Sequence, residues 1–515
     1  MHKSLRILEI LAAIARHIDD DADQCEDVAM TERAASLHAM AVTCKAFVDP
    51  ALTVLWRQGS SLGDLVRCMP EDLWSRDAAG HIHLQRPIRQ SDWDRFHYYA
   101  MKVQSIRIGC NETRTTILAL NTENGPLLPN LRELTWDISR NNPGLTYISS
   151  FLSPGLRRLT LQLGVAPSLL CHDARYFLDL IQIAAPLLKE IIFVHCPNNT
   201  SSQKIPLIAG GLQLDRLRTF RWPTPLTKHD VGLLGTLPHL EVLEIYMMPR
   251  LEASPDTRFA LLSKDSYPAL RQLVLKAHYL EHCLNFIDAL QSSRIQILEL
   301  ACEDISYDGL GRLDACLNGA GSTSSLRVFR ISGYAGNNPD HPAPWRALTA
   351  FSSAKHLEEL DIGLKISFAL EDDFIQELVV NWPRLKYLRL GISPFSSRSM
   401  YGGGPSLQSL VHIANNCPLL TSLIMSVDDV PDTTLSVEAM QPYATNLQSL
   451  HVGSSHIHDP VRAAMLLSKL FPRLTVVTGL NRNDGKSELW RIVQDTVRLI
   501  AQVRKEEQAR LVQNA

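Results

Sequence analysis

The sequence predicts an α/β fold, a repeat solenoid with a parallel sheet on its concave side and helices outside, preceded by a small all-α module of three helices. Three observations support this. A short apolar motif recurs through most of the 515 residues, helical periodicity separates its copies, and three apolar helical segments precede the first copy. Because a hydrophobic content of 45% and a charged content of 20% are ordinary, we expect a mostly ordered globular chain.

The recurring motif reads apolar-x-x-apolar-x-apolar, as in "LRELTW" and "LEELDI". Its copies begin at Val103, Leu131, Leu156, Leu188, Leu217, Leu240, Leu270, Ile295, Leu326, Leu357, Leu385, Leu420, Leu447 and Leu474. Successive copies lie about 28 to 29 residues apart on average, within the range of roughly 20–29 residues that is typical of leucine-rich repeats. The sequence therefore predicts a leucine-rich-repeat solenoid over residues 103–480.

Each copy of the motif predicts one strand, and the segment after it predicts a helix. The last two apolar positions are two residues apart, so they point to the same side of a strand. Between copies the apolar spacing becomes helical, as in "ARYFLDLIQIAA" and "EDDFIQELVVNW". Strands and helices that alternate at this interval stack into a curved solenoid with its parallel sheet on the concave side.

Both ends of such an array need a cap. Residues 58–102 are interpreted as connecting and N-terminal capping helices, since "SDWDRFHYYAMKVQ" begins with a capping-box pattern, Ser91 followed by Asp94. Three aromatic residues of that helix are expected in the core: Trp93, Phe96 and Tyr99. Residues 485–515 are interpreted as a C-terminal capping helix and tail. Its apolar residues at helical spacing are Leu489, Val493, Val497 and Ile500.

The first 57 residues predict the helical module. Within residues 5–18, "LRILEILAAIARHI", apolar side chains share one helical face: Leu8, Leu11, Ile14 (or Ala15) and Ile18. A polar, acidic loop is expected from Asp19 to Thr31, followed by helices over Glu32 to Thr43 and roughly Pro50 to Arg57. These helices carry more apolar surface than so short a segment can enclose, so the module must pack on another surface.

The module and the repeats together resemble a known family. "ILEIL", "LHAMAVTCKAF" and "PALTVLWR" look like an F-box, and the whole chain resembles F-box/leucine-rich-repeat proteins of the fungal type. F-boxes dock on the Skp-type adaptor of a cullin–RING ubiquitin ligase. The resemblance therefore implies a set of adaptor-contact or F-box-core residues: Leu8, Ile10, Leu11, Ile14, Leu37, Cys44, Phe47, Leu55 and Trp56.

No motif in the sequence predicts catalysis. There is no nucleophile elbow, no P-loop and no metal-ligand spacing. The glycine-rich "YGGGPS" at 401–406 lacks the lysine of a phosphate loop. Three histidines near Asp459 are interpreted as polar loop residues rather than metal ligands: His451, His456 and His458. We expect a protein that is not an enzyme and that needs no cofactor and no metal.

Exposed strand positions are the expected binding surface. The residue between the last two apolar positions of a repeat faces the concave side, where the candidate substrate-binding residues are Arg221, Glu244, Glu299, Arg330, Asp361 and Arg389. Equivalent positions hold Ile192, Val274 and Ile424, and a mixed, partly apolar surface suits a protein partner.

A second column of residues follows the first apolar position of each repeat. Many of its members are basic: Arg132, Arg157, Lys189, Arg218, Arg271, Arg327 and Lys386. The column is open to two interpretations, a basic rim or a set of solvated turns.

The function that follows is the substrate-recognition subunit of a cullin–RING (SCF-type) ubiquitin ligase, with the F-box on the Skp-type adaptor and the repeats on a protein substrate. Two alternatives stay open: a leucine-rich-repeat scaffold without ubiquitin-ligase activity, and an enzyme regulator such as a GTPase-activating repeat protein. The net charge of −3 argues against nucleic-acid and membrane partners, because both need a concentrated basic surface.

The compartment is inferred from cysteine usage and from the N-terminus. Ten cysteines are scattered without disulfide or zinc spacing, which favours a reducing environment. The N-terminal apolar run is too short for a signal peptide, and no run approaches the roughly 18 apolar residues of a membrane span. We expect a cytoplasmic or nuclear protein.

Overall fold

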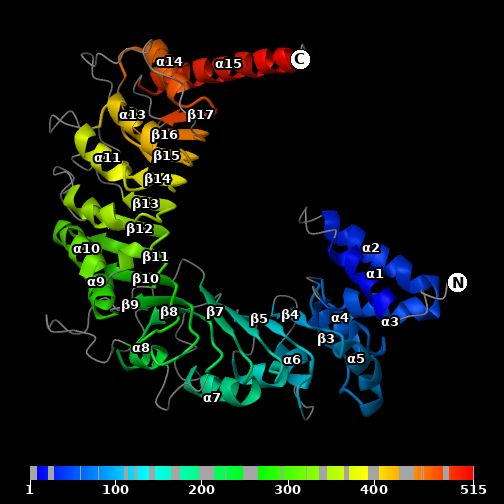
Figure 1. Ribbon diagram of the computed structural model, residues 1–515. Helices are drawn as coiled ribbons and strands as arrows, with labels where there is room; N and C mark the ends of the chain where they lie inside the picture. Colours follow the sequence, from blue (N-terminus) through cyan, green and yellow to red (C-terminus); the bar gives the residue numbers. More distant parts are fainter. Residues whose placement is uncertain are drawn as a thin grey trace. The chain divides into compact units, whose positions relative to one another are not determined.

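The computed structural model (Figure 1) forms two compact units, residues 1–240 and 241–515, which are described separately. The residues that the structure describes are 8–20, 28–57, 60–78, 80–109, 114–120, 125–138, 145–163, 174–195, 214–226, 228–247, 262, 265–290, 294–319, 322–335, 345–364, 370–391, 405–427, 446–453, 455, 457–479 and 486–513.

The first unit begins with the predicted three helices: α1 (Leu8–Asp20), α2 (Val28–Thr43) and α3 (Lys45–Leu55). Ala15, Leu37 and Val54, one from each helix, form a small buried core. Three partly buried side chains pack against that core: Ile18, Met40 and Leu55. Each helix therefore contributes one apolar face to a common interior.

The helix bounds correct two expectations. Part of the loop expected over residues 19–31 is helical, since α1 runs to Asp20 and α2 starts at Val28. The third helix begins at Lys45 rather than near Pro50, because the break falls at Cys44, whose backbone is extended (φ −161°, ψ 161°). Pro50 lies inside α3 and is buried, where it removes one helical hydrogen bond without ending the helix.

A connecting region joins the module to the repeats. It comprises β1 (Ser60–Ser61), α4 (Leu62–Arg67), an antiparallel hairpin of β2 (Trp74–Arg76) and β3 (Ile82–Leu84), the 3-10 helix η2 (Gln90–Asp92) and α5 (Trp93–Ala100). A capping box starts α4, because Ser61 Oγ accepts from the Asp64 N–H at 3.1 Å while Asp64 accepts from the Ser61 N–H at 2.9 Å. The hairpin and β1 were not predicted.

The capping box expected at Ser91 and Asp94 is wrong by two residues. The capping residue is Arg89, at the start of η2, and Asp92 three residues later accepts a hydrogen bond of 2.8 Å from the backbone N–H of Arg89. Trp93 and Phe96 of α5 are buried, as predicted.

Parallel strands follow in the first unit, each paired with the next in sequence order. After β1, the described strands are β4 (Ser105–Ile108), β5 (Glu133–Ile138), β6 (Arg158–Leu163), β7 (Glu190–His195) and β8 (Thr219–Pro225). The helices between and after them are α6 (Arg114–Leu120), the 3-10 helix η3 (Leu145–Phe151), α7 (Ala174–Ala184) and α8 (Lys228–Leu234).

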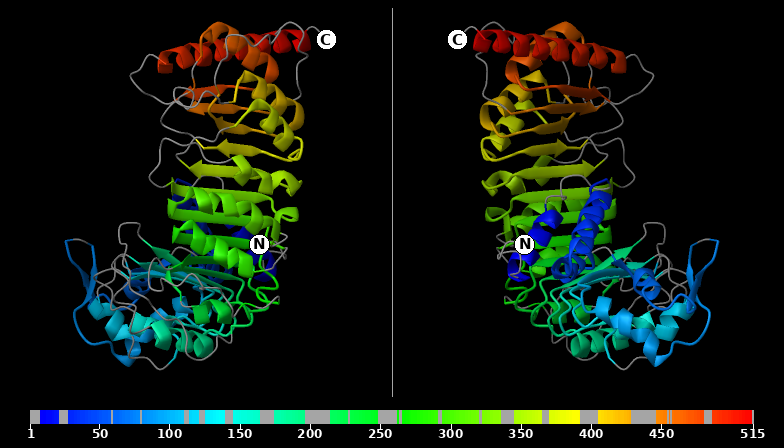
Figure 2. Two further views of the ribbon diagram at one scale, coloured as in Figure 1. Left: turned by 90° about the vertical axis from the view of Figure 1, so that its left-hand side faces the viewer. Right: turned by 90° about the vertical axis from the view of Figure 1, so that its right-hand side faces the viewer.

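The second unit repeats this arrangement, with strands in one layer and helices in another (Figure 2). Its described strands are β9 (Val242–Met247), β10 (Gln272–Tyr279), β11 (Ile297–Ile305), β12 (Val328–Ala335), β13 (Glu359–Leu364), β14 (Tyr387–Leu390), β15 (Ser422–Met425), β16 (Ser449–Gly453) and β17 (Val476–Gly479). Its described helices are α9 (Leu280–Ala289), α10 (Tyr307–Gly319), η5 (Ser322–Ser324), η6 (Trp345–Ser353), α11 (Asp372–Val379), α13 (Leu407–Asn416), α14 (Pro460–Leu470) and α15 (Lys486–Gln513).

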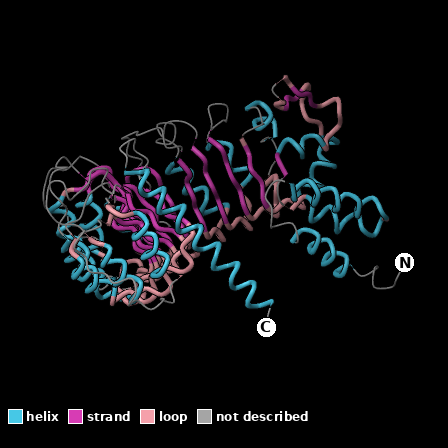
Figure 3. Tube along the Cα trace, turned by 90° about the horizontal axis from the view of Figure 1, so that it is seen from above, coloured by secondary structure: helices cyan, strands magenta, loops and turns pink. Residues whose placement is uncertain are grey.

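The core of both units is built from the apolar positions of the motif. The middle apolar residue of every copy is buried: Ile106, Leu134, Leu159, Ile191, Phe220, Leu243, Leu273, Leu298, Phe329, Leu360, Leu388, Leu423, Leu450 and Val477. Each such side chain contributes about 1.5–3 kcal/mol when fully buried. Helices lie between many of the successive strands along the chain (Figure 3). The predicted fold class, a leucine-rich-repeat solenoid after an N-terminal helical module, is confirmed.

α15 covers the last strand of the second unit. Its Trp490, Val493 and Val497 are buried, and Trp490 Nε1 donates to the Ser455 carbonyl at 2.9 Å. Gln494 bonds the backbone of β17 through the N–H of Val477. The helix therefore satisfies backbone groups that the end of a sheet would leave open. Within the described ranges, no helix is both long and apolar enough to cross a bilayer.

Candidate binding surfaces

The sheet face of the second unit brings five of the predicted substrate-binding residues into one row. Strand register places successive members on neighbouring strands: Glu244, Val274, Glu299, Arg330, Asp361, Arg389, Ile424, His451 and Thr478. We call this set the sheet row. It mixes both signs of charge with apolar side chains.

Charged side chains in the sheet row form ion pairs with one another or with charged residues at neighbouring positions of the strands. Arg330 lies between two carboxylates, with Nη1 2.5 Å from Glu299 and Nε 2.6 Å from Glu359. The hydrogen bonds that Arg330 donates to Glu359, and those to Glu299, raise the pKa of Arg330. Glu244 pairs with Lys276 at 2.6 Å. Because such partly exposed pairs contribute at most about 1 kcal/mol each, they order the surface more than they stabilise the fold.

Asp361 and Arg389 form the most buried pair of the sheet row. The Arg389 Nη1 lies 3.7 Å from Asp361 Oδ1, and the Asp361 side chain is 20% exposed. Burial raises the pKa of Asp361, and the nearby Arg389 opposes that shift. A Cβ at Gly363, on the next outward position of β13, would lie 3.3 Å from Asp361 Oδ1 and 3.4 Å from Arg389 Nη1, so that position closely borders the pair.

Arg221, the sixth predicted residue, belongs to the first unit. It is partly buried on β8 and is in register with Ile192 of β7. In the same unit Arg107 donates to Gln162 at 2.6 Å.

No metal centre forms among the described residues. His451 bonds the Thr478 hydroxyl at 2.7 Å, and burial lowers its pKa. His458 is exposed, and His456 lies outside the described residues. Pro405 and Ser406 are the described part of "YGGGPS", and Ser406 caps α13 by accepting from the Gln408 N–H at 3.0 Å.

The helical module divides the nine residues of the F-box resemblance into distinct environments. Leu11 and Leu37 are fully buried, and Leu55 packs against the module core. Ile10 is 36% exposed and Ile14 is 40% exposed, one helical turn apart on α1. The remaining members with described side chains are half-buried: Cys44, Phe47 and Trp56. The Leu8 side chain lies outside the described part of the chain.

Contacts at the end of α3 attach the module to the connecting region. The Trp56 ring lies 4.6 Å from the Tyr99 ring of α5, and Asp49 forms an ion pair with Lys102. The Arg57 carbonyl accepts from the N–H groups of Gln104 and Ser105 at 3.1 and 3.0 Å. Trp56 therefore has a partner inside the protein.

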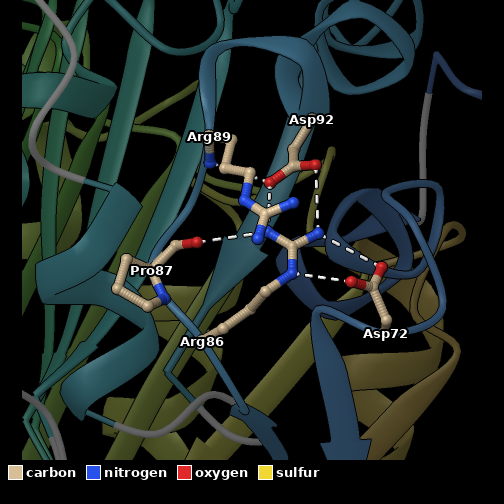
Figure 4. A network of polar contacts seen from close by, with 5 residues as sticks. All are labelled: Asp72, Arg86, Pro87, Arg89 and Asp92. Atoms are coloured by element: carbon tan, nitrogen blue, oxygen red, sulfur yellow. Dashed lines mark hydrogen bonds and ion pairs between the residues drawn. The ribbon is translucent and has the colours of Figure 1, made fainter.

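An acid–guanidinium network centred on Arg86 links the exposed Asp72, which precedes the hairpin, to the buried Asp92 of η2 (Figure 4). Arg86 Nε lies 2.7 Å from Asp72 and Nη1 lies 2.6 Å from Asp92. Arg86 Nη1 also donates to the Pro87 carbonyl at 3.1 Å. Hydrogen bonds from Arg86, and then from the Arg89 N–H, lower the pKa of Asp92. All the side-chain N–H groups of Arg86 donate to Asp72, Pro87 and Asp92, so we interpret the network as structural.

Comparisons with known proteins support no finer assignment than the fold. No protein-family model matches the chain, and no curated protein matches it. Among solved structures, the chain is similar to TLR13 in a TLR13–ssRNA13 complex, with 16% sequence identity and a TM-score of 0.39. The match covers 74% of this chain and 51% of that one, about half its length. The leucine-rich-repeat fold rests on the strands and buried rows described above.

Proposed function

We propose that this protein is the substrate-recognition subunit of a cullin–RING (SCF-type) ubiquitin ligase, with the helical module on the Skp-type adaptor and the repeats on a protein substrate. One observation carries the proposal. The module completes its own core and still exposes Ile10 and Ile14, two residues that the F-box resemblance assigns to adaptor contact or the F-box core. Val42 of α2 is exposed as well, at 69%. Apolar side chains gathered on one small module suit a protein interface.

The mechanism is tethering. A receptor that holds a target beside a charged ubiquitin-conjugating enzyme raises the effective concentration of the target, so it needs no catalytic residue of its own. The proposal accordingly assigns no enzymatic activity and no cofactor to the chain, and a cytoplasmic or nuclear location to the complex.

A protein substrate suits the sheet row. Its charges are of both signs and are largely paired, as at Glu299–Arg330, and the row also contains the half-buried Ile424. A uniformly charged partner would gain little from a surface whose charges already neutralise each other. A partner with mixed polar and apolar side chains fits it better.

A scaffold without ubiquitin-ligase activity is the second candidate. It is favoured by the internal use of part of the F-box set, because Trp56 packs on Tyr99 while Leu11 and Leu37 fill the module core. In that case the module would serve only to cap the repeats.

Adaptor binding separates the two candidates. Purified full-length chain, immobilised, is expected to retain purified Skp-type adaptor, and Ile14→Asp is expected to abolish retention because it places a charge in an apolar contact. Leu499→Asp on α15, an equally conspicuous exposed leucine (62%), is the matched control and should retain the adaptor. A folded wild-type chain that retains no adaptor excludes the ligase function and leaves the scaffold.

A further inference from the structure

Three polar side chains form a cluster on the outward face of three neighbouring strands of the second unit, β9, β10 and β11 (Figure 1). Tyr246 of β9 and His278 of β10 both hydrogen-bond Glu303 of β11. The His278 Nδ1 lies 2.6 Å from Glu303 Oε2, and the Tyr246 hydroxyl donates to Glu303 Oε1 at 3.4 Å. We call these three residues the Glu303 cluster. Each carboxylate oxygen is bonded by a residue of another strand, which orients the carboxylate.

A local irregularity of β11 presents Glu303 to the cluster. On the β10 side the strands pair regularly as far as Asp304, which lies opposite Tyr279. On the β12 side the register shifts between Cys302 and Asp304, so Glu303 is an extra residue of β11. A Cβ at Gly333 of β12 would clash with the Cys302 carbonyl oxygen, so this pairing requires glycine there. Bulges of this kind redirect a side chain and are common beside binding sites.

The Glu303 carboxylate is paired differently from the other acids on this face. At the outward positions of β9–β13 that the structure describes, the other acids pair with lysine or arginine: Glu244 with Lys276, Glu299 and Glu359 with Arg330, and Asp361 with Arg389. Those four acidic side chains are 20–28% exposed. Glu303 has a histidine and a tyrosine as its partners, and its side chain is 53% exposed.

An acid in the column that follows the first apolar position of each repeat is paired in the same way as those four. Glu358 lies between Arg327 and Lys386, and it accepts from Arg327 Nε at 2.7 Å and from Lys386 Nζ at 2.8 Å. Hydrogen bonds from Lys386 and Arg327 lower the pKa of Glu358. Its side chain is 20% exposed. Carboxylates that bind cations of the protein are thus largely covered, whereas the Glu303 carboxylate faces solvent.

The Glu303 cluster uses its donors internally and presents acceptors to solvent. An ionised carboxylate can only accept, so His278 Nδ1 carries the hydrogen of the bond to Glu303, and in the neutral imidazole Nε2 is then an acceptor. The Tyr246 O–H is also directed to Glu303, whose oxygens keep further lone pairs. A group that donates several hydrogen bonds and accepts none complements this set. Among side chains, those are the lysine ammonium and the arginine guanidinium.

The surroundings of the cluster also suit a cation. Lys276, two residues before His278 on β10, pairs with Glu244 at 2.6 Å. The residue after Glu303 is a second acid, the half-buried Asp304. An aromatic ring beside the carboxylate, that of Tyr246, favours a positive group further because its π face attracts positive charge.

We propose that the Glu303 cluster binds a lysine or arginine side chain of a partner protein. Glu303 follows Glu299 of the sheet row by four residues on the same strand, roughly 13 Å, so one partner can contact both. The name "substrate" for this partner rests on the proposed function, whereas the binding itself does not.

The test measures binding of labelled peptides to the full-length chain at pH 8, where imidazoles are neutral. One peptide contains four arginines, a second four lysines and a third four glutamines. We expect the first two to bind and the third not to bind. Tighter binding of the arginine peptide identifies a guanidinium as the preferred group, and equal binding shows that an ammonium suffices.

Two variants and a control locate the binding. Glu303→Gln keeps the size of the side chain and is expected to weaken binding of the cationic peptides about fivefold. His278→Lys places a cation of the protein beside Glu303 and should weaken binding at least as much, although Glu303 is retained. The matched control, Glu488→Gln, removes an equally exposed carboxylate (55%) from α15 and should bind within about twofold of wild type.

Three outcomes overturn the proposal: cationic peptides that bind no better than the glutamine peptide, Glu303→Gln that binds like Glu488→Gln, or His278→Lys that binds like wild type. Adaptor binding is measured on the same proteins. Loss of peptide binding with normal adaptor retention locates the effect in the Glu303 cluster. A chain that binds the cationic peptides but no adaptor keeps this site and loses only the ligase function.

Discussion

The free energy of the proposed adaptor contact can be estimated from two exposed residues of α1, Ile10 and Ile14. Ile10 and Ile14 still expose 36% and 40% of their surface, and full burial of such a side chain contributes about 1.5–3 kcal/mol. Covering what remains exposed would contribute roughly 0.5–1.2 kcal/mol at each residue, or about 1–2 kcal/mol together. Since 1.4 kcal/mol is a factor of ten, Ile10→Ala/Ile14→Ala should weaken adaptor binding by about 5- to 30-fold.

Isothermal titration of the adaptor into each full-length variant checks this number. Alanine is the better helix former, so α1 itself should not be weakened. Leu499→Ala/Val503→Ala removes a comparable exposed apolar pair, 62% and 46% exposed at the same four-residue spacing on α15, and should leave the Kd unchanged. An unchanged Kd for the α1 variant, or an equal loss for both, would refute the assignment of α1 to the interface.

Three further predictions concern the supports of these surfaces. Trp56→Ala removes the ring contact with Tyr99. It should speed amide hydrogen exchange in α3 and leave the exchange rates of β9–β16 constant. An unchanged exchange rate in α3 would contradict the role of Trp56 in attaching α3 to the connecting region. Glu358 has a lowered pKa in the folded state, so it stabilises the fold above its unfolded pKa of about 4.3 and that contribution is lost as pH falls through its folded pKa. Glu358→Gln should therefore lower the free energy of unfolding at pH 7 by up to about 1 kcal/mol and converge with wild type in acid, whereas a constant difference across pH would exclude the ion pairs as its cause. Arg86→Lys cannot hold both carboxylates of its network in bidentate geometry and should lower the midpoint of urea unfolding; an unchanged midpoint would show the network to be dispensable.

The repeat fold was predictable because its information is local. Apolar residues at fixed spacing identify each strand. The same motif identified in every copy the middle apolar position, from Ile106 to Val477, that is buried in the structure. Register between repeats then follows, since equivalent positions pair. This is why Glu244, Glu299, Arg330, Asp361 and Arg389 could be assigned to one face before the structure was known.

What failed depended on contacts that no local pattern records. Arg86 bonds Asp72, 14 positions away, across an unpredicted hairpin. It also bonds Asp92, which pairs with Arg89 at the start of η2 in place of the expected Ser91 and Asp94. Likewise, Arg330 pairs with Glu359 in a neighbouring column, and this depends on which rotamer a long side chain adopts. A helix that continues through Pro50 was missed because the signal for its start, the extended backbone at Cys44, is conformational.

The central claim is that the full-length protein enters a ligase complex through its helical module. Size-exclusion chromatography with light scattering on a mixture of this 57.6 kDa chain, the Skp-type adaptor and the cullin tests it most directly. The account predicts a single species whose mass equals one copy of each, and Ile14→Asp should remove this chain from it. A folded chain that elutes alone at 57.6 kDa, while adaptor and cullin elute together, would contradict the account.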